Sequence, residues 1–170
     1  MTDPAPTNDY DQQSDELWGK LDQLDEQDFR ARIEELVTEL PAGSPVAAFE
    51  RACAFDSTGH PEEAVPLYRE SLGLGLEGER RRRAVIQLSS SLRNLGQVQE
   101  SVALLTAERE RTSDRLDDAV SAFLALALAD SGREREAVSI ALAALAPHLP
   151  RYQRSLRNYA RVLVEATSTG

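Results

Sequence analysis

Hydrophobic and polar positions follow a helical period in paired runs, and a glycine separates the two runs of each pair. In the first pair a small residue, Ala52, and a large apolar residue, Phe55, stand seven and four positions before Gly59. These two side chains lie on one face of a helix, and glycine readily adopts the left-handed conformation that ends one. The same arrangement recurs at Gly96 and Gly132, at intervals of 37 and 36 residues. This interval predicts a repeat of two helices joined by a tight turn.

The run after each glycine keeps a register of its own. A small residue stands five positions after the glycine and an apolar residue stands nine positions after it, for example Ala64 and Tyr68 in the first repeat. We therefore expect paired helices and one further helix beyond them. The expected ranges are 45–57, 61–73, 79–95, 97–110, 114–131, 133–146 and 150 to about 166.

The segment before the repeats has the pattern of a short helical cap. Asp25 is a good capping residue for a helix that reaches Leu40, and an apolar stripe runs along that helix from Phe29. A short segment around Trp18 precedes it. We expect residues 1–13 to be a disordered acidic tail, because they show no apolar period.

These signals divide the chain into four parts. Its 170 residues suit one domain, and an aromatic content of 5% suits helices packed through alanine and leucine. We expect an acidic tail over 1–13, an amino-terminal helical cap over 14–44, three repeats over 45–149, and a carboxy-terminal capping helix with a short tail over 150–170. The expected repeats cover about 45–76, 79–113 and 114–149.

The repeat resembles the tetratricopeptide repeat (TPR), and strings such as Asp56-Ser57-Thr58-Gly59 resemble its bacterial group five. The resemblance implies an all-α, TPR-like right-handed α-solenoid of about three helix-turn-helix repeats with a capping helix at each end. It also implies a protein-binding function. The chain departs from the repeat where an aromatic residue is expected eleven positions before each glycine: Ala48, Val85 and Ser121 stand there.

By the same resemblance, the first helices line a concave groove. The string Ser155-Leu156-Arg157-Asn158 copies Ser91-Leu92-Arg93-Asn94, which would place two arginine-asparagine pairs in that groove. Such groups can hold a carboxylate or a peptide backbone, although they can also be solvated helix ends. The residues that we assign to partner binding are Phe49, Asp56, Ile86, Arg93, Asn94, Leu126, Asp130, Arg157, Asn158 and Arg161.

Some chaperone-binding relatives hold a partner's terminal carboxylate with a lysine and an asparagine in this groove. The matching positions here are Phe49 and Cys53, Ile86 and Ser90, and Ala122 and Leu126, none of which supports that clamp. A more apolar groove favours an extended or helical segment with apolar anchors.

Charge is concentrated at the amino terminus. Residues 1–28 hold nine carboxylates against Lys20, a net of −8 out of −10, whereas the last twenty residues hold four arginines against Glu165. Opposite charges at the two ends attract each other. A regulatory or sensor module is therefore the alternative to an adaptor, with the acidic segment masking the groove until a partner displaces it.

Enzymatic and cofactor chemistry has little support in the sequence. His60 and His148 are isolated in turn-like strings, no metal-ligand spacing is present, and we expect no catalytic, cofactor or metal site. Cys53 stands on an apolar helical position and is expected to be a buried small hydrophobe. A non-enzymatic scaffold is the function that remains.

The expected partner is a protein or peptide, and self-association is also open. Residues 80–83 are four consecutive arginines, but they fan around a helix and the chain carries a net −10, so nucleic acid is disfavoured. The apolar stretch over 119–129 is too short to cross a bilayer, and no signal-peptide pattern begins the chain. We expect a cytoplasmic protein with no membrane role.

Overall fold

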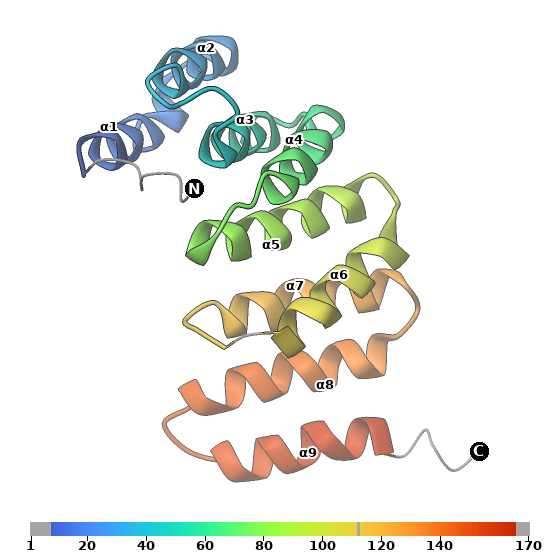
Figure 1. Ribbon diagram of the computed structural model, residues 1–170. Helices are drawn as coiled ribbons and strands as arrows, with labels where there is room; N and C mark the ends of the chain where they lie inside the picture. Colours follow the sequence, from blue (N-terminus) through green and yellow to red (C-terminus); the bar gives the residue numbers. More distant parts are fainter. Residues whose placement is uncertain (1–7, 112, 166–170) are drawn as a thin grey trace. The chain divides into compact units, whose positions relative to one another are not determined.

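Helices and turns make up the whole described part of the chain, which is residues 8–111 and 113–165 of a computed structural model (Figure 1). No strand occurs within these ranges. The chain divides into two compact units, Met1–Ser91 and Leu92–Gly170. The division falls in the last turn of helix α5, Gly78–Asn94.

Unit 1 begins with a cap that packs onto the first helical pair. The Asp25 side chain accepts a hydrogen bond from the Gln27 N–H at 2.9 Å, which confirms the expected cap. Phe29, Ile33 and Val37 are buried together with alanines of the next helix, and Trp18 and Leu24 pack against this cluster. The helices of unit 1 are α1 (Asn8–Trp18), the 3₁₀ turn η1 (Leu21–Gln23), α2 (Glu26–Val37), α3 (Pro45–Ser57), α4 (Pro61–Gly73) and most of α5.

The α3–α4 pair has the ends that the sequence predicts. Pro45 and Pro61 each occupy a first helical position, where proline lacks no needed donor. Gly59 has a φ of 79°, a left-handed conformation that suits the tight turn between the helices. Ala52 and Ala64 are fully buried, and the rings of Phe49 and Tyr68 lie 6.4 Å apart. The pair thus packs as one two-helix repeat.

Unit 2 continues the pattern of helices packed in sequence order. Helices α6 and α7, α7 and α8, and α8 and α9 are neighbours. Leu124 and Leu128 are buried in its core, and the Ser139 hydroxyl donates a hydrogen bond to the Ala160 carbonyl at 2.6 Å, joining α8 to α9. The elements are α6 (Val98–Arg111), α7 (Asp117–Asp130), α8 (Glu134–Leu145), the 3₁₀ turn η2 (Ala146–His148) and α9 (Gln153–Glu165).

Four boundaries differ from the prediction by three residues or more, and one of them is the end of α2, which lies at Val37 rather than Leu40. Residues 8–13 belong to helix α1 and are not disordered, because contacts described below hold this polar segment; residues 1–7 of the expected tail lie outside the described residues. Helix α7 begins at Asp117, after a turn in which the Asp114 carboxylate accepts the Leu116 N–H. Helix α9 begins at Gln153, because Tyr152 has a φ of 70°, and the expected tail over 166–170 is likewise outside the described residues.

Candidate functional site

Two residues assigned to the groove from the register lie in the core of unit 1. The Phe49 side chain is 0% exposed, and Ile86 is also buried. Phe49 packs against the Tyr68 ring, and the Arg83 guanidinium lies over the Phe49 ring, 5.3 Å from its centroid. Neither apolar side chain offers a surface to a partner in this conformation, which corrects the expectation for both. Their size and apolar character favour burial over a place in an open groove.

Asp56 belongs to a polar network that links three helices of unit 1. Its carboxylate accepts hydrogen bonds from the Ser91 hydroxyl of α5 at 2.8 Å and the Tyr68 hydroxyl of α4 at 3.2 Å. Burial raises the pKa of this carboxyl, and the two hydrogen bonds partly offset the rise. Asp56 therefore acts here as a packing residue between helices.

Cys53 lies beside the same network and is buried, as predicted. Its thiol donates to the Gln87 side-chain carbonyl at 3.2 Å, and the Tyr68 hydroxyl lies 3.7 Å from the sulfur. Burial is the main reason that the pKa of this thiol is raised. A raised pKa leaves little thiolate, the form that reacts.

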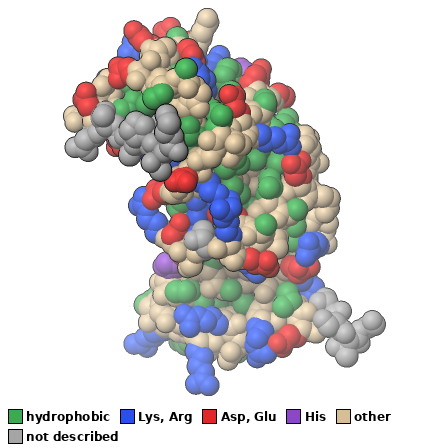
Figure 2. All heavy atoms as spheres, in the orientation of Figure 1, with side chains coloured by type: hydrophobic (Ala, Val, Ile, Leu, Met, Phe, Trp, Pro, Cys, Tyr) green, Lys and Arg blue, Asp and Glu red, His purple; other side chains and the backbone are tan. Residues whose placement is uncertain are grey.

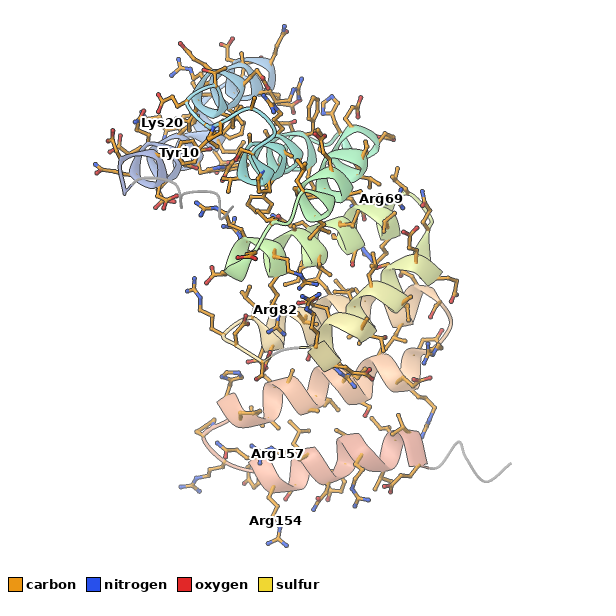
Figure 3. The ribbon with its side chains drawn as sticks, in the orientation of Figure 1. Tyr10, Lys20, Arg69, Arg82, Arg154 and Arg157 are labelled. Carbon is orange, nitrogen blue, oxygen red and sulfur yellow. The ribbon has the colours of Figure 1, made fainter. Side chains whose placement is uncertain are left out.

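Helix α1 is fastened to unit 1 mainly through polar and aromatic side chains. The Trp18 indole N–H donates to the Glu50 carboxylate of α3 at 2.8 Å, and Asp11 pairs with Arg80 of α5 at 2.5 Å. Tyr10 of α1, labelled in Figure 3, is only 2% exposed. Burial is the largest cause that raises the pKa of both Tyr10 and Glu50. The pairing of Asp11 with Arg80 could not be read from the sequence, because residues 8–13 show no apolar period.

The four consecutive arginines do not form one basic face. Arg80 pairs with Asp11, Arg83 lies over the Phe49 ring, and the Arg82 side chain is buried. This distribution follows from the turn of about 100° per residue in a helix.

In unit 2 the structure brings together Arg93 and Asp130, two residues that the sequence assigned to the groove. Arg93 Nε lies 3.0 Å from Asp130 Oδ2, an ion pair that lacks the alignment of a hydrogen bond. Asn94 is exposed beside Arg93, and its side-chain oxygen lies 3.5 Å from the Arg93 guanidinium. The Leu126 side chain on α7 is 48% exposed. Among the positions assigned to partner binding, unit 2 therefore has one exposed apolar side chain, Leu126, with the polar side chains of Arg93, Asn94 and Asp130.

Helix α9 carries the remaining assigned residues on its exposed sides. Arg157, Asn158 and Arg161 are exposed, and Arg161 pairs with Glu165 on the same helix. In the view of Figure 2, blue side chains project from the part of unit 2 that α9 forms. Two exposed aromatic side chains, Tyr159 of α9 and Tyr152 just before that helix, are not among the residues assigned to partner binding.

Two of the open clefts in the described part of unit 1 contain no assigned partner-binding residue. One of about 410 Å³ lies between α1 and α2 and is lined largely by charged side chains, including Glu16, Arg32 and Glu39. The other, of about 300 Å³, lies between α2 and α3 beside Phe55.

The described ranges, 8–111 and 113–165, contain neither a metal-ligand set nor a membrane-spanning helix. There, no three histidine, cysteine or carboxylate side chains come together as a metal-ligand set. The same ranges contain no helix with the length and apolar character needed to cross a membrane.

Comparison with known proteins identifies this array of two-helix repeats. The profile of the tetratrico peptide repeat family TPR_5 matches residues 45–163, and the chain belongs to this family. A crystal structure of putative kinesin light chain nearly identical TPR-like repeats from Podosopora anserina is 21% identical, with a TM-score of 0.68 over 91% of each chain. A second structure of these repeats is 22% identical, with a TM-score of 0.67 over 91% of this chain and 90% of that one. The predicted all-α, TPR-like fold is confirmed; no curated protein matches the chain.

Proposed function

We propose that the chain is a non-enzymatic adaptor that binds a protein or peptide through the concave face of its TPR-like array. The observation that carries the proposal is the exposed Leu126 on α7, the first helix of its repeat. In repeat arrays, stacked units create extended binding surfaces. We further propose that the protein is bacterial and cytoplasmic and that it needs neither a cofactor nor a metal.

The exposed side of α7 is a small apolar stripe with polar groups at one end. Ala122, Leu126 and Ala129 are exposed at helical spacing, and Asp130 follows them. Burying a leucine side chain contributes about 1.5–3 kcal/mol, so Leu126 can serve as an anchor contact. Arg93 holds Asp130, and the adjacent Asn94 amide can donate to a peptide carbonyl. The stripe therefore fits an extended or helical segment with an apolar anchor.

The test compares two equally exposed side chains on the two helices of one repeat. Leu126 on α7 is 48% exposed and Val138 on α8 is 47% exposed. Affinity purification from native lysate with mass spectrometry should lose the partner for Leu126→Glu and retain it for Val138→Glu, with both variants showing unchanged helicity. Loss with Val138→Glu alone would place binding on the second helices and contradict the proposal.

The alternative function is a regulatory module in which α1 masks a binding surface of unit 1. The contacts of Asp11 with Arg80 and of Trp18 with Glu50 favour it, because they tie an acidic helix to α3 and α5. Asp11→Asn should then raise partner affinity. Asp9→Asn removes the same charge from an exposed position of α1 and should leave affinity unchanged. If Asp11→Asn and Asp9→Asn bind the partner with equal affinity, the regulatory alternative is wrong.

A further inference from the structure

The cleft between α2 and α3 in unit 1 has an apolar floor. Its volume is about 300 Å³, which is at the lower end of the range for small-molecule sites. The side chains of Ile33 and Ala54, 1% and 2% exposed, line it together with the half-buried Phe55 and the exposed Ala31. Such a lining favours the apolar part of a ligand, because covering it removes apolar surface from water.

Most of the lining residues share one face of each helix. Intervals of three and four residues bring side chains to the same face of a helix. The residues with this spacing are Gln27, Arg30, Ala31 and Glu34 on α2, and Arg51, Ala54 and Phe55 on α3. We call these residues and Ile33 the α2–α3 cleft. It is a groove between two helix faces that pack side by side, and Arg30 belongs to its wall.

Contacts with α3 and the turn after it hold the Arg30 guanidinium at the cleft. Nη1 of Arg30 donates to Thr58 Oγ1 at 2.7 Å, and the Thr58 hydroxyl donates in turn to the Ala54 carbonyl at 2.8 Å. The guanidinium carbon lies 5.6 Å from the centroid of the Phe55 ring. Nε and Nη2 make no hydrogen bond within the described residues, and neither is buried. Arginine uses this pair of nitrogens to bind a carboxylate through two parallel hydrogen bonds.

Arg30 also lacks an ion-pair partner among the described residues, although two carboxylates are close in sequence. Glu26 and Glu34 stand four residues before and after it on α2, a spacing at which opposite charges can pair. Glu34 instead accepts two hydrogen bonds of 2.7 Å from Arg51 of α3, which lower the pKa of the Glu34 carboxyl. Two arginines and one glutamate line the cleft, so its charges sum to +1.

We propose that the α2–α3 cleft binds a small monocarboxylate with an aliphatic tail. The carboxylate would accept hydrogen bonds from Nε and Nη2 of Arg30, and the tail would cover Ile33, Ala54 and Phe55. This ligand site goes beyond the proposed adaptor function. It belongs to unit 1, whereas Leu126 belongs to unit 2, so the two proposals can fail separately.

Charge selects a monocarboxylate over other ligands of the same cleft. One uncompensated arginine balances one carboxylate, whereas a phosphate monoester carries about −1.5 to −2 near neutral pH. An amine would meet Arg30 as a like charge. Helix α2 has four carboxylates against two arginines, so it repels extended anions such as nucleic acid or an anionic membrane. A single carboxylate with an apolar tail suits both Arg30 and the floor.

The test titrates octanoate into the full chain and follows the backbone amides by ¹H–¹⁵N NMR spectroscopy. Octanoate should bind saturably and shift the amides of Ala31 and Ala54. Octylammonium has the tail with the opposite charge, and acetate has the charge without the tail. Each should bind at least about tenfold more weakly than octanoate. Octyl phosphate should bind no more tightly than octanoate.

Three variants locate the carboxylate at Arg30. Arg30→Gln should weaken octanoate binding by about tenfold, because it removes a charge-assisted pair of hydrogen bonds. Arg32→Gln removes an arginine of the same helix that does not line the cleft, so it should leave the affinity unchanged. Ala31→Glu puts a negative charge into the cleft while it keeps the Arg30–Thr58 contact, and it should abolish binding. Circular dichroism should show the same helicity for all three.

Several results would overturn the proposal. They are equal octanoate affinity of Arg30→Gln and the unaltered chain, equal binding of octylammonium, tighter binding of octyl phosphate, amide shifts confined to unit 2, and no saturable binding of octanoate. Leu126→Glu on α7 should leave octanoate affinity unchanged. Loss of a protein partner with that variant therefore tests the adaptor function alone.

Discussion

Arg93 Nε and Asp130 Oδ2, both residues of the second unit, lie 3.0 Å apart, an ion pair between the last turn of α5 and the carboxy-terminal end of α7. The Arg93 side chain is largely shielded, whereas about half of the Asp130 side chain is accessible to solvent. Both residues come from positions that the sequence assigned to partner binding. The ion pair fixes the polar end of the exposed stripe that contains Leu126.

The Arg93–Asp130 pair should show a small, favourable coupling to stability. Arg93→Ala and Asp130→Ala are each expected to lower the free energy of unfolding, with a coupling of about 0.5 kcal/mol because solvent screens the exposed carboxylate. Urea denaturation of the two single variants and the double variant measures this coupling. The charge-exchanged chain, Arg93→Asp with Asp130→Arg, should recover part of the loss; zero coupling would show that the contact contributes nothing in solution.

Trp18→Phe should weaken the attachment of α1. The substitution removes the N–H that the buried Glu50 carboxylate accepts at 2.8 Å, while a phenyl ring can still pack edge-on against Phe29. A buried acceptor left without its donor costs about 1–3 kcal/mol. Chemical denaturation followed by circular dichroism should show a loss of this size.

Tyr10→Phe serves as the control for that variant, because it removes a hydroxyl from the same helix. The Tyr10 hydroxyl is buried and finds no hydrogen-bond partner among the described residues. Its removal should leave stability unchanged or raise it by up to about 1 kcal/mol. A loss as large as that of Trp18→Phe would mean that α1 is not held in the way described.

Glu50→Gln should make the chain relatively more stable as pH rises. Burial raises the pKa of this carboxyl above its ordinary value of 4.5, so the folded chain keeps the proton to higher pH than the unfolded chain does. The stabilisation from Glu50 is therefore complete below that ordinary pKa and is lost as pH rises through the raised folded value. Glutamine has no such titration and still offers an oxygen to Trp18.

The measurement is the difference in unfolding free energy between Glu50→Gln and the unaltered chain, from urea denaturation at several pH values between about 4.5 and 7.5. As pH rises, the unfolding free energy of Glu50→Gln should increase relative to that of the unaltered chain. A constant difference would mean that the carboxyl has the same pKa in the folded and unfolded chains, against the buried position seen for Glu50.

Tyr152→Gly should raise the stability of the folded chain. Glycine adopts a φ of 70° without the strain that tyrosine bears, so a gain of about 0.5–1 kcal/mol is expected after the greater freedom of the unfolded glycine is counted. Thermal unfolding followed by circular dichroism measures the gain. Tyr152→Phe keeps the aromatic ring and the strain, so it should leave stability nearly unchanged; a gain equal to that of Tyr152→Gly would contradict the account.

The sequence predicts most of the repeat helices because their ends carry local signals. Pro45, Gly59 and Pro61 place the ends of α3 and α4 at the residues where the structure has them. The Asp25 cap is likewise a local hydrogen bond. Signals of this kind depend on neighbouring residues alone and can be read without the fold.

Tertiary contacts explain what the sequence did not reveal. Residues 8–13 of α1 have no apolar period of their own, so the order of this part depends on contacts such as Asp11–Arg80, which join residues far apart in the chain. Phe49 fits the groove register, yet Tyr68 and Arg83 cover it. Repeat spacing assigns a residue to a helix face, and the packing of neighbouring helices decides whether that face stays open.

The central claim is that a partner binds the face of the first helices, and site-specific photocrosslinking tests it most directly. A benzophenone amino acid at position 126 on α7 or at position 138 on α8 places the same reactive group on two similarly exposed sites. We predict that a partner crosslinks to position 126 and not to position 138. Crosslinks that form equally at both positions, or at position 138 alone, would contradict the claim.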